Sequence, residues 1–595
     1  MNHSLKHLLV RLLNHISARR KKQFALLSVL MILASFAEVV SIGAVLPFIG
    51  MLTAPQQVFH HPYSQPIVQM LGLTEPRQLL LPFTIAFSLA TLSAGGIRLV
   101  LLWASTRLAF AIGAEISFEM YLRTLYQPYS VHCSKNSGEI ISAISVKANA
   151  IIYTTIVPIL TIISSVFMLF TILTTLLLID PFVVAAALFG FGIIYSVIIK
   201  WTNKQIQTDG ECIARESDNL IKSLQEGLSA IRDILINGTQ KLYGRKYQDA
   251  DLPLRRAQGN TIFVSSSPRF ILESCGMVLI AILAYSLAQR ANGLSSAIPI
   301  LSVLAVGAQR LLPVMQQTYS SWVNIKSGKA SLADTLDLLD QPIPDYANEV
   351  EAMPLSFKSD ITLKKMGFCY EKNSPYVLKN INLKIKQGNR VGFIGTSGSG
   401  KSTLVDILMG LLQPTVGEFQ IDGQNINKKN VRSWQANISH VPQSIFLADR
   451  SIAENIAFGV PKPLINMELV RNSAELAQLA ETIDGWPEKY QTQVGERGAR
   501  LSGGQLQRIG IARALYKQAK VIILDEATSS LDSKTENSVM KSIINLKTDL
   551  TILIIAHRVT TLKNCDQIIE LEKGSIKRIV SFEEIIQKPH KKAKR

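Results

Sequence analysis

The residues best suited to chemistry in this chain form a glycine-rich loop, GTSGSGKST, at positions 395–403. The loop follows the apolar run RVGFIG and fits the pattern G-x-x-x-x-G-K-[ST], in which backbone N–H groups and a lysine bind nucleotide phosphates. The helix expected after the loop directs its positive end toward the same anion. We therefore predict phosphate binding by Gly395, Thr396, Ser397, Gly398, Ser399, Gly400, Lys401, Ser402 and Thr403.

Further residues indicate a metal and hydrolysis. The apolar run VIILDE predicts a buried strand ending at Asp525, a carboxylate suited to organise Mg²⁺ together with the Ser402 hydroxyl. Glu526 follows directly and is well placed to polarise an attacking water. Upstream, LSGGQLQR predicts a second anion-binding element at a helix start, formed by Ser502, Gly503, Gly504 and Gln505. The combination predicts hydrolysis of a nucleoside triphosphate.

The elements that must position this chemistry occupy only the second part of the chain. Of the 595 residues, 48% are hydrophobic, and the excess lies in the first 330. Six apolar segments there are long enough to cross a bilayer, which takes about 20 residues. We place the predicted spans near 24–52, 79–106, 148–179, 181–200, 262–288 and 296–323. From about residue 358, strand-like and helix-like segments alternate, as in an α/β domain.

Basic residues set the predicted orientation of the spans. The polar segments 107–147 and 201–261 are rich in Lys and Arg, so we expect both, and the N-terminus, in the cytoplasm. The predicted fold class is an all-α six-helix transmembrane domain followed by an α/β P-loop nucleotide-binding domain. Its predicted parts are a membrane domain at 1–335, a linker at 336–357, the nucleotide-binding domain at 358–586 and a basic tail at 587–595. The external segment 62–73 fits a short interfacial helix or a plain loop.

Composition argues against other classes of protein. The net charge of +18 fits the basic cytoplasmic face of a membrane protein, and we expect no nucleic-acid partner. The five cysteines are scattered without a CxxC pair, so neither disulfides nor a zinc site is expected. The basic run before Phe24 leads into the first apolar segment without a cleavage pattern, which predicts a retained first span.

These motifs together resemble those of the ATP-binding-cassette family, and the resemblance covers the whole chain. It implies ATP and Mg²⁺ as ligands. Tyr370 in GFCY would stack on adenine, Gln443 in HVPQ would contact metal and water, and His557 in IIAHR would sense the γ-phosphate. Asp532 in SSLD would belong to a dimer-contact loop, and QVGERG (493–498) resembles a loop of exporters. Leu506 departs from the family pattern, in which a basic residue is common there.

The resemblance also implies an assembly. In this family the phosphate loop of one cassette and the signature serine of another share one nucleotide. A chain with one cassette and six spans therefore resembles a half-transporter that forms a homodimer with two complete ATP sites. We expect an exporter of the inner (plasma) membrane with both termini cytoplasmic. Short cytoplasmic helices near 126–137 and 222–236 would rest on the cassettes and convert their closure into rocking of the bundles.

Charged residues inside the predicted spans bear on the cargo. Counting about 1.5 Å per residue from the span ends places Arg98, Arg269 and Arg310 in the cytoplasmic half and Glu38 in the outer half. Arg269 and Glu273 could pair on one helical face, whereas Arg98 and Arg310 have no evident partner at their depth. We therefore predict that the three arginines bind the phosphate of an amphiphile entering from the inner leaflet.

Three short stretches narrow the resemblance: FAEVVSIGAVLPFI, PRFILE and QRLLP are similar to those of PglK-type lipid-linked oligosaccharide flippases. This implies that a polyprenyl-pyrophosphate-linked glycan moves from the inner to the outer leaflet, with glycan-assembly enzymes as further partners. A peptide or drug exporter and a lipopolysaccharide-type lipid exporter remain open alternatives. A third alternative is a regulator or channel derived from this family. The presence of Glu526 and His557 argues against it, because such a protein does not need to hydrolyse ATP.

Overall fold

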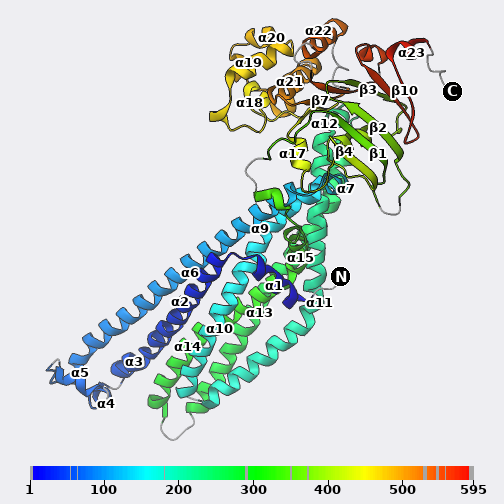
Figure 1. Ribbon diagram of the computed structural model, residues 1–595. Helices are drawn as coiled ribbons and strands as arrows, with labels where there is room; N and C mark the ends of the chain where they lie inside the picture. The colour runs from blue at the N-terminus through cyan, green and yellow to red at the C-terminus, as the bar shows by residue number, and fades with distance from the viewer. Residues whose placement is uncertain are drawn as a thin grey trace. The chain divides into compact units, whose positions relative to one another are not determined.

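The computed structural model forms two compact units (Figure 1). It describes residues 4–53, 55–62, 64–70, 72–179, 181–288, 293–348, 352–371, 374–526, 532–544, 549–556 and 558–587. The first unit comprises residues 1–127 and 134–343, and the second 128–133 and 344–595. The boundary falls inside the predicted linker, 336–357. Helix α15 (Lys329–Leu339) continues past residue 335 because its buried Leu336 and Leu339 pack in the core of the first unit.

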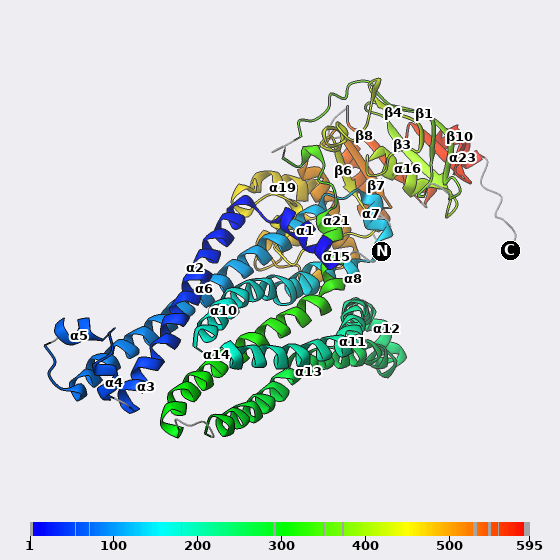
Figure 2. The ribbon, with the colours of Figure 1, turned by 90° about the horizontal axis from the view of Figure 1, so that it is seen from below.

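Long helices make up the first unit (Figures 1 and 2): α2 (Ala18–Gly43), α6 (Leu80–Leu125), α10 (Val157–Ile179), α11 (Pro181–Ser229), α13 (Gln240–Ala288) and α14 (Gly293–Ser327). Helix α13 packs against α11 and α14, and α10 packs against α2 and α14. Helix α6 has 46 residues and α11 and α13 have 49 each. At 1.5 Å per residue they are roughly 70 Å long, over twice the hydrocarbon thickness of a bilayer. The predicted cytoplasmic segments are therefore mostly continuations of these helices.

Shorter elements connect the long ones: α1 (Leu5–His15), α3 (Val45–Thr53), α4 (Pro55–Phe59), α5 (Gln65–Met70), the 3₁₀ turn η1 (Pro76–Leu79), α7 (Tyr129–Ser134), α8 (Ser137–Ile141), α9 (Ala148–Ile151), the π-helices η2 (Ser142–Lys147) and η3 (Ile152–Ile156), and α12 (Ile231–Asn237). Helix α5 shows that the segment 62–73, for which the sequence left a helix and a loop open, contains a short helix. Helix α7 lies inside the first predicted short helix, 126–137. Helix α12 covers only the second half of the other, 222–236, because α11 continues to Ser229.

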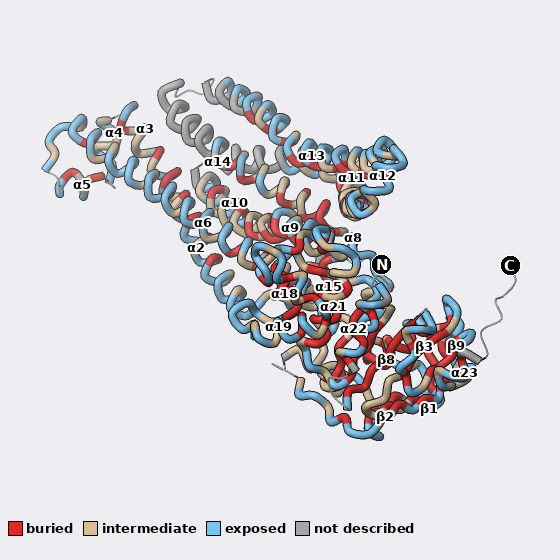
Figure 3. The backbone as a smooth tube through the Cα atoms, turned by 90° about the horizontal axis from the view of Figure 1, so that it is seen from above, coloured by how far each residue is buried: buried red, intermediate tan, exposed pale blue. Residues whose placement is uncertain are grey.

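Three helical stretches among the described residues are long and apolar enough to cross a membrane: Ala18–Leu52, Pro76–Leu125 and Ser137–Thr175. They coincide with the first three predicted spans. In the most apolar 18 residues of the second stretch, only 11% of the residues are buried. Figure 3 shows exposed residues along α6. An apolar surface of this extent suits contact with lipid or a partner subunit. The other three predicted spans coincide with α11, α13 and α14, which include side chains outside the described residues.

Two sheets form the second unit. Strands β1 (Asp360–Phe368), β2 (Leu378–Lys386), β4 (Val416–Ile421) and β5 (Gln424–Asn425) make an antiparallel sheet in the order β2-β1-β4-β5. The other sheet has the order β10-β9-β3-β8-β7-β6, made of β3 (Arg390–Gly395), β6 (Ile438–Val441), β7 (Val521–Asp525), β8 (Thr551–Ile555), β9 (Gln567–Glu572) and β10 (Ser575–Val580). Its strands are parallel except β10, which pairs antiparallel with β9.

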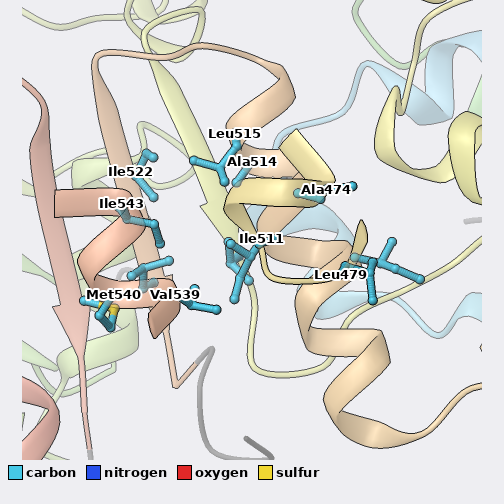
Figure 4. Packing of buried hydrophobic residues seen from close by; sticks show 14 of the residues in the cluster. Ala474, Leu479, Ile511, Ala514, Leu515, Ile522, Val539, Met540 and Ile543 are labelled. Atoms are coloured by element: carbon cyan, nitrogen blue, oxygen red, sulfur yellow. The ribbon is translucent and has the colours of Figure 1, made fainter. Parts of the chain in front are cut away.

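The second unit also contains the helices α16 (Lys401–Leu408), α17 (Val431–Gln435), α18 (Ile452–Ile456), α19 (Met467–Leu476), α20 (Ala480–Asp484), α21 (Gly503–Tyr516), α22 (Ser533–Ile544) and α23 (Phe582–Gln587). Alternate residues of β7 enter different cores, Ile523 on one face and Ile522 on the other. Figure 4 shows side chains of α21 and α22, among them Leu515 and Ile543, converging near Ile522. This packing fixes the strand end at which Asp525 lies.

Candidate functional site

The glycine-rich loop connects a buried strand to a helix, as the motif requires. Strand β3 has four consecutive buried residues before the loop, and α16 begins at Lys401. Gly398 has φ 77° and Gly400 has φ 96°, a region that residues with a Cβ rarely adopt. At Gly400 an added Cβ would also lie 2.7 Å from Leu378. The glycines therefore permit the tight turn that leaves backbone N–H groups available to an anion.

Lys401 and Ser399 are held inside this loop. The Lys401 ammonium, on a residue only 8% exposed, donates to the carbonyl oxygens of Gly395 at 2.9 Å and Thr396 at 3.1 Å. The Ser399 hydroxyl is buried, and it has no hydrogen-bond partner among the described residues. A buried polar atom without a partner costs free energy, and a phosphate oxygen would supply one. The loop thus has the donors and the positive charge for a nucleotide phosphate.

The aromatic Tyr370 lies beside the loop. Its hydroxyl is 3.1 Å from the Thr403 hydroxyl, and its ring meets Phe368 edge to face with centroids 5.0 Å apart. These two contacts orient the ring, while the residue remains 51% exposed. An oriented aromatic ring with an accessible surface next to the phosphate loop can stack on a nucleotide base.

The hydrolytic residues follow the end of β7. Glu526 has φ 48°, and its carboxylate Oε2 accepts a hydrogen bond from the Gln443 amide at 2.7 Å. The hydroxyl of Ser402, the amide oxygen of Gln443 and the carboxylate of Asp525 are oxygen donors of the kind Mg²⁺ prefers. Gln443 thus holds the carboxylate of Glu526, whose role as a general base stays a prediction.

Asp406 of α16 was not predicted as a site residue, although it lies near the carboxylate of Asp525. Burial, and to a smaller extent the charge of Asp525, raise the pKa of Asp406 to about 6. The sequence could have indicated Asp406 by its position, about one and a half turns along the helix that starts at Lys401. Asp406 adds a carboxyl group whose ionisation depends on the charge at the predicted metal position.

The signature residues form a well-defined helix start. The Ser502 hydroxyl accepts from the Gln505 N–H at 3.3 Å, and the Gln505 side chain accepts from the Ser502 N–H at 2.8 Å, which is a capping box. Gly503 and Gly504 make the first turn of the 14-residue helix α21. Among the described residues, no hydrogen bond or ion pair joins this helix start to the glycine-rich loop.

Of the predicted residues Asp532 and His557, the structure describes only Asp532. Asp532 accepts a hydrogen bond from the Thr535 N–H at 3.0 Å at the start of α22, and hydrogen bonding from Thr535 lowers the pKa of Asp532. His557, together with residues 529–531 of the predicted dimer-contact loop (529–532), lies outside the described residues. Its predicted contact with the γ-phosphate stays a prediction.

A groove lies beside the signature helix and the segment that follows Gln443. It has a volume of about 600 Å³ and is lined by residues that include Gln443, Phe446, Arg497 and Leu506. Phe446 is 60% exposed, so an apolar ring is available at its surface. Arg513 anchors this segment: its guanidinium donates to the Phe446 carbonyl at 3.1 Å and lies 4.6 Å from the Phe458 ring centre.

The charged residues of the membrane unit are arranged differently from the prediction. Glu38 of α2 pairs with both Arg98 of α6, at 3.4 Å, and Arg310 of α14, at 3.1 Å. The prediction that these two arginines lack a partner, and that Glu38 lies at a different depth, is wrong. Depth was counted along the chain from each predicted span end, and such a count does not contain the tilt and packing that bring α2, α6 and α14 together.

Arg269 forms the local pair that the sequence left as an alternative. Its guanidinium Nε is 2.7 Å from the Glu273 carboxylate, one helical turn along α13. The two side chains are 64% and 44% exposed, so the pair lies at an accessible surface of the single chain. Of the three predicted substrate arginines, the structure brings Arg98 and Arg310 together at one carboxylate, and Arg269 has a carboxylate of its own.

Comparisons with known proteins support the division into two units. The model of the ABC transporter transmembrane region matches residues 16–307, and the ABC transporter model matches residues 378–529. The toxin RTX-I translocation ATP-binding protein of Actinobacillus pleuropneumoniae is 37% identical over 285 residues, which are 48% of this chain and 40% of the relative. The alpha-hemolysin translocation ATP-binding protein HlyB of Escherichia coli is 39% identical over 268 residues, 45% of this chain and 37% of the relative. The chain thus matches less than half the length of these relatives.

The chain belongs to the ABC transporters, with a transmembrane region and an ATP-binding domain in one polypeptide. Its fold is the one seen in a bacterial Atm1-family ABC exporter with ATP bound. That likeness has a TM-score of 0.78 and covers 96% of this chain and 97% of the other, at 22% sequence identity.

Proposed function

We propose that this protein uses ATP hydrolysis to move an anionic amphiphile from the inner to the outer leaflet of the membrane. The observation that carries the proposal is the cluster of Glu38, Arg98 and Arg310. One buried carboxylate and two half-exposed guanidinium groups leave a net positive charge on three transmembrane helices. Charges inside a membrane region are costly, and they commonly mark a substrate path. Guanidinium groups suit phosphate because they donate two parallel hydrogen bonds.

The most specific candidate cargo is a polyprenyl-pyrophosphate-linked oligosaccharide. Its pyrophosphate would meet the arginines, its glycan would occupy the wet interior, and its polyprenyl chain would stay in lipid. The second candidate is a polypeptide, because the names of two relatives refer to toxin translocation. A polypeptide has no fixed phosphate group, so transport of one would not depend on the arginine pair.

The proposed active form is a homodimer in the inner (plasma) membrane, with the ATP-binding domains cytoplasmic. The lack of a hydrogen bond or ion pair between the signature helix start and the glycine-rich loop, within the described ranges, supports two ATP sites shared between the copies, each with Mg²⁺. In this assembly the groove beside Phe446 would receive α12 of the second copy, whose Leu235 and Ile236 are 61% and 75% exposed. Such a contact would transmit closure of the cassettes to the bundle.

Transport by the purified protein in proteoliposomes tests the cargo. Arg310→Ala leaves Glu38 paired with Arg98, so the chain should fold and keep its basal ATPase activity. Flipping of a pyrophosphate-linked glycolipid should fall more than about tenfold, since a charged hydrogen bond contributes roughly 1.5–3 kcal/mol. Lysine at this position should restore only part of the activity because it lacks the planar fork.

Arg255→Ala is the matched control, because Arg255 forms an exposed pair with Asp251 four residues away on α13. It should leave flipping unchanged. Transport of a polypeptide but not of the glycolipid, or glycolipid flipping that is insensitive to Arg310→Ala, would reject the proposed cargo.

A further inference from the structure

The proposed function does not explain why the carboxylate of Glu38 is placed behind the two arginines. The residue is 1% exposed, while the side chains of Arg98 and Arg310 are 45% and 38% exposed. A buried charge needs a partner, but one arginine would be enough to neutralise it. Two arginines, from two different helices, make Glu38 a junction of α2, α6 and α14.

Each arginine uses only part of its guanidinium group on Glu38. Arg310 approaches carboxylate oxygen Oε1 through Nε, and Arg98 approaches Oε2 through Nη1. Within the described ranges, neither arginine lies within ion-pair distance of a second carboxylate. The accessible surface of the cluster therefore belongs to the two arginine side chains, whose guanidinium groups have further N–H donors, and the carboxylate of Glu38 is out of contact with solvent.

The charge of the cluster depends on Glu38. With the carboxylate the three groups sum to one positive charge, and without it they would sum to two. Like charges in contact repel, and an anion close to both arginines would also feel repulsion from Glu38. The carboxylate thus holds the two guanidinium groups together and at the same time weakens their hold on a bound anion.

We infer that Glu38 is a positioning residue that acts as the internal counter-ion of the substrate site. It presents Arg98 and Arg310 together to a phosphate group, and its charge keeps the affinity low enough for that group to leave at the end of transport. The inference rests on the proposed function, because it takes the substrate to be anionic. A carboxylate that only joins three helices would not influence the affinity for an anion in this way.

Glu38→Gln separates the two roles, since glutamine has nearly the same size and no charge. We use farnesyl pyrophosphate as the probe and farnesol as its uncharged control. Binding is measured as the concentration that half-maximally changes ATPase activity, and turnover as flipping of a fluorescent polyprenyl pyrophosphate in proteoliposomes. We expect the half-maximal concentration to fall at least about tenfold, because a repulsive charge near the anion is removed. Turnover should fall as well, because release becomes slow.

Further variants control this experiment. Glu119→Gln removes a carboxylate that pairs with Arg123 on α6, outside the cluster, and should change neither quantity. Should Glu38→Gln fail to fold, Arg98→Gln is compared with Arg98→Gln combined with Glu38→Gln. Both variants lack the hydrogen bonds of Arg98 and differ only in the charge of residue 38, so the half-maximal concentration should be at least about tenfold lower in the double variant. Equal half-maximal concentrations in these two variants would overturn the charge argument.

The outcomes for the inference and for the proposed function differ. A wild-type protein that responds to farnesyl pyrophosphate, with a Glu38→Gln variant whose half-maximal concentration is unchanged or higher, would overturn the counter-ion role and leave the proposed function standing. A wild-type protein that responds equally to farnesol and farnesyl pyrophosphate would overturn both.

Discussion

Replacing Lys147 should destabilise the membrane unit more than any exposed lysine substitution. Lys147 is the last residue of the π-helix η2, and its side chain is 5% exposed. Its ammonium bonds to Asp218 of α11 at 2.7 Å and to Asp334 of α15 at 2.6 Å. One buried cation thus connects three separate elements, and Lys147→Met would leave two carboxylates facing each other.

The magnitude follows from the exposure of the two carboxylates. Removing one partner of a buried ion pair costs about 3–5 kcal/mol when the remaining charge cannot reach water. Here the aspartate side chains are 27% and 47% exposed, so each recovers part of its hydration. We therefore expect a loss of about 2–4 kcal/mol for Lys147→Met, from lost charged hydrogen bonds and repulsion between the aspartates. Asp218→Asn should cost more than Asp334→Asn because Asp218 is the less exposed.

The assay is thermal unfolding of the purified protein in one detergent, followed by tryptophan fluorescence. Lys147→Met should lower the transition temperature by about 3–6 °C. Adding Asp218→Asn and Asp334→Asn to this variant removes the stranded charges and should recover at least half of the loss. Lys246→Met is the control, since Lys246 is 54% exposed and pairs with Glu226 alone. An unchanged transition in Lys147→Met, or no recovery in the triple variant, would refute the reasoning.

Three further predictions concern the ATP-binding domain. Glu526→Gln should retain ATP binding, trap a closed dimer and lower hydrolysis at least about 10²-fold, the effect of losing a general base; hydrolysis near the wild-type rate would remove Glu526 from that role. Co-expressed Lys401→Ala and Ser502→Arg chains should regain ATPase activity as purified heterodimers, because both lesions fall in one shared site and leave the other intact. Heterodimers as inactive as either parent would exclude shared sites. The raised pKa of Asp406 means that the folded state binds its proton more tightly than the unfolded state, so its ionisation destabilises the fold as the pH rises through about 6. Asp406→Asn should therefore raise the unfolding temperature of nucleotide-free protein at pH 7.5 and have little effect near pH 4; equal effects at both pH values would contradict this.

Local patterns in the sequence were enough for much of the ATP site. The loop at 395–403 and the capping box of Ser502 and Gln505 depend on residues a few positions apart, and the structure has both as local elements. For Arg269 the sequence left two alternatives, pairing with Glu273 or binding of a substrate phosphate. The pair could be foreseen because it depends only on a spacing of four residues along one helix. Contacts of this kind follow from helix and turn geometry alone.

The Glu38 cluster could not be predicted in this way. Arg98 is 60 residues from Glu38 in the chain, and Arg310 is farther still. Whether they meet depends on the tilt and packing of α2, α6 and α14, which a count of residues along each helix does not contain. The contact of the Tyr370 and Thr403 hydroxyls has the same origin, because it requires the packing of the antiparallel sheet against the phosphate-binding helix.

The grouping of Pro128–Cys133 with the ATP-binding unit has a consequence for synthesis of the protein. These residues leave the ribosome roughly two hundred residues before Pro344, where the remainder of their unit begins. At about 5–20 residues per second, this segment waits about 10–40 s for its packing partners. A ribosome that stalls before Pro344 would therefore leave the segment permanently without them.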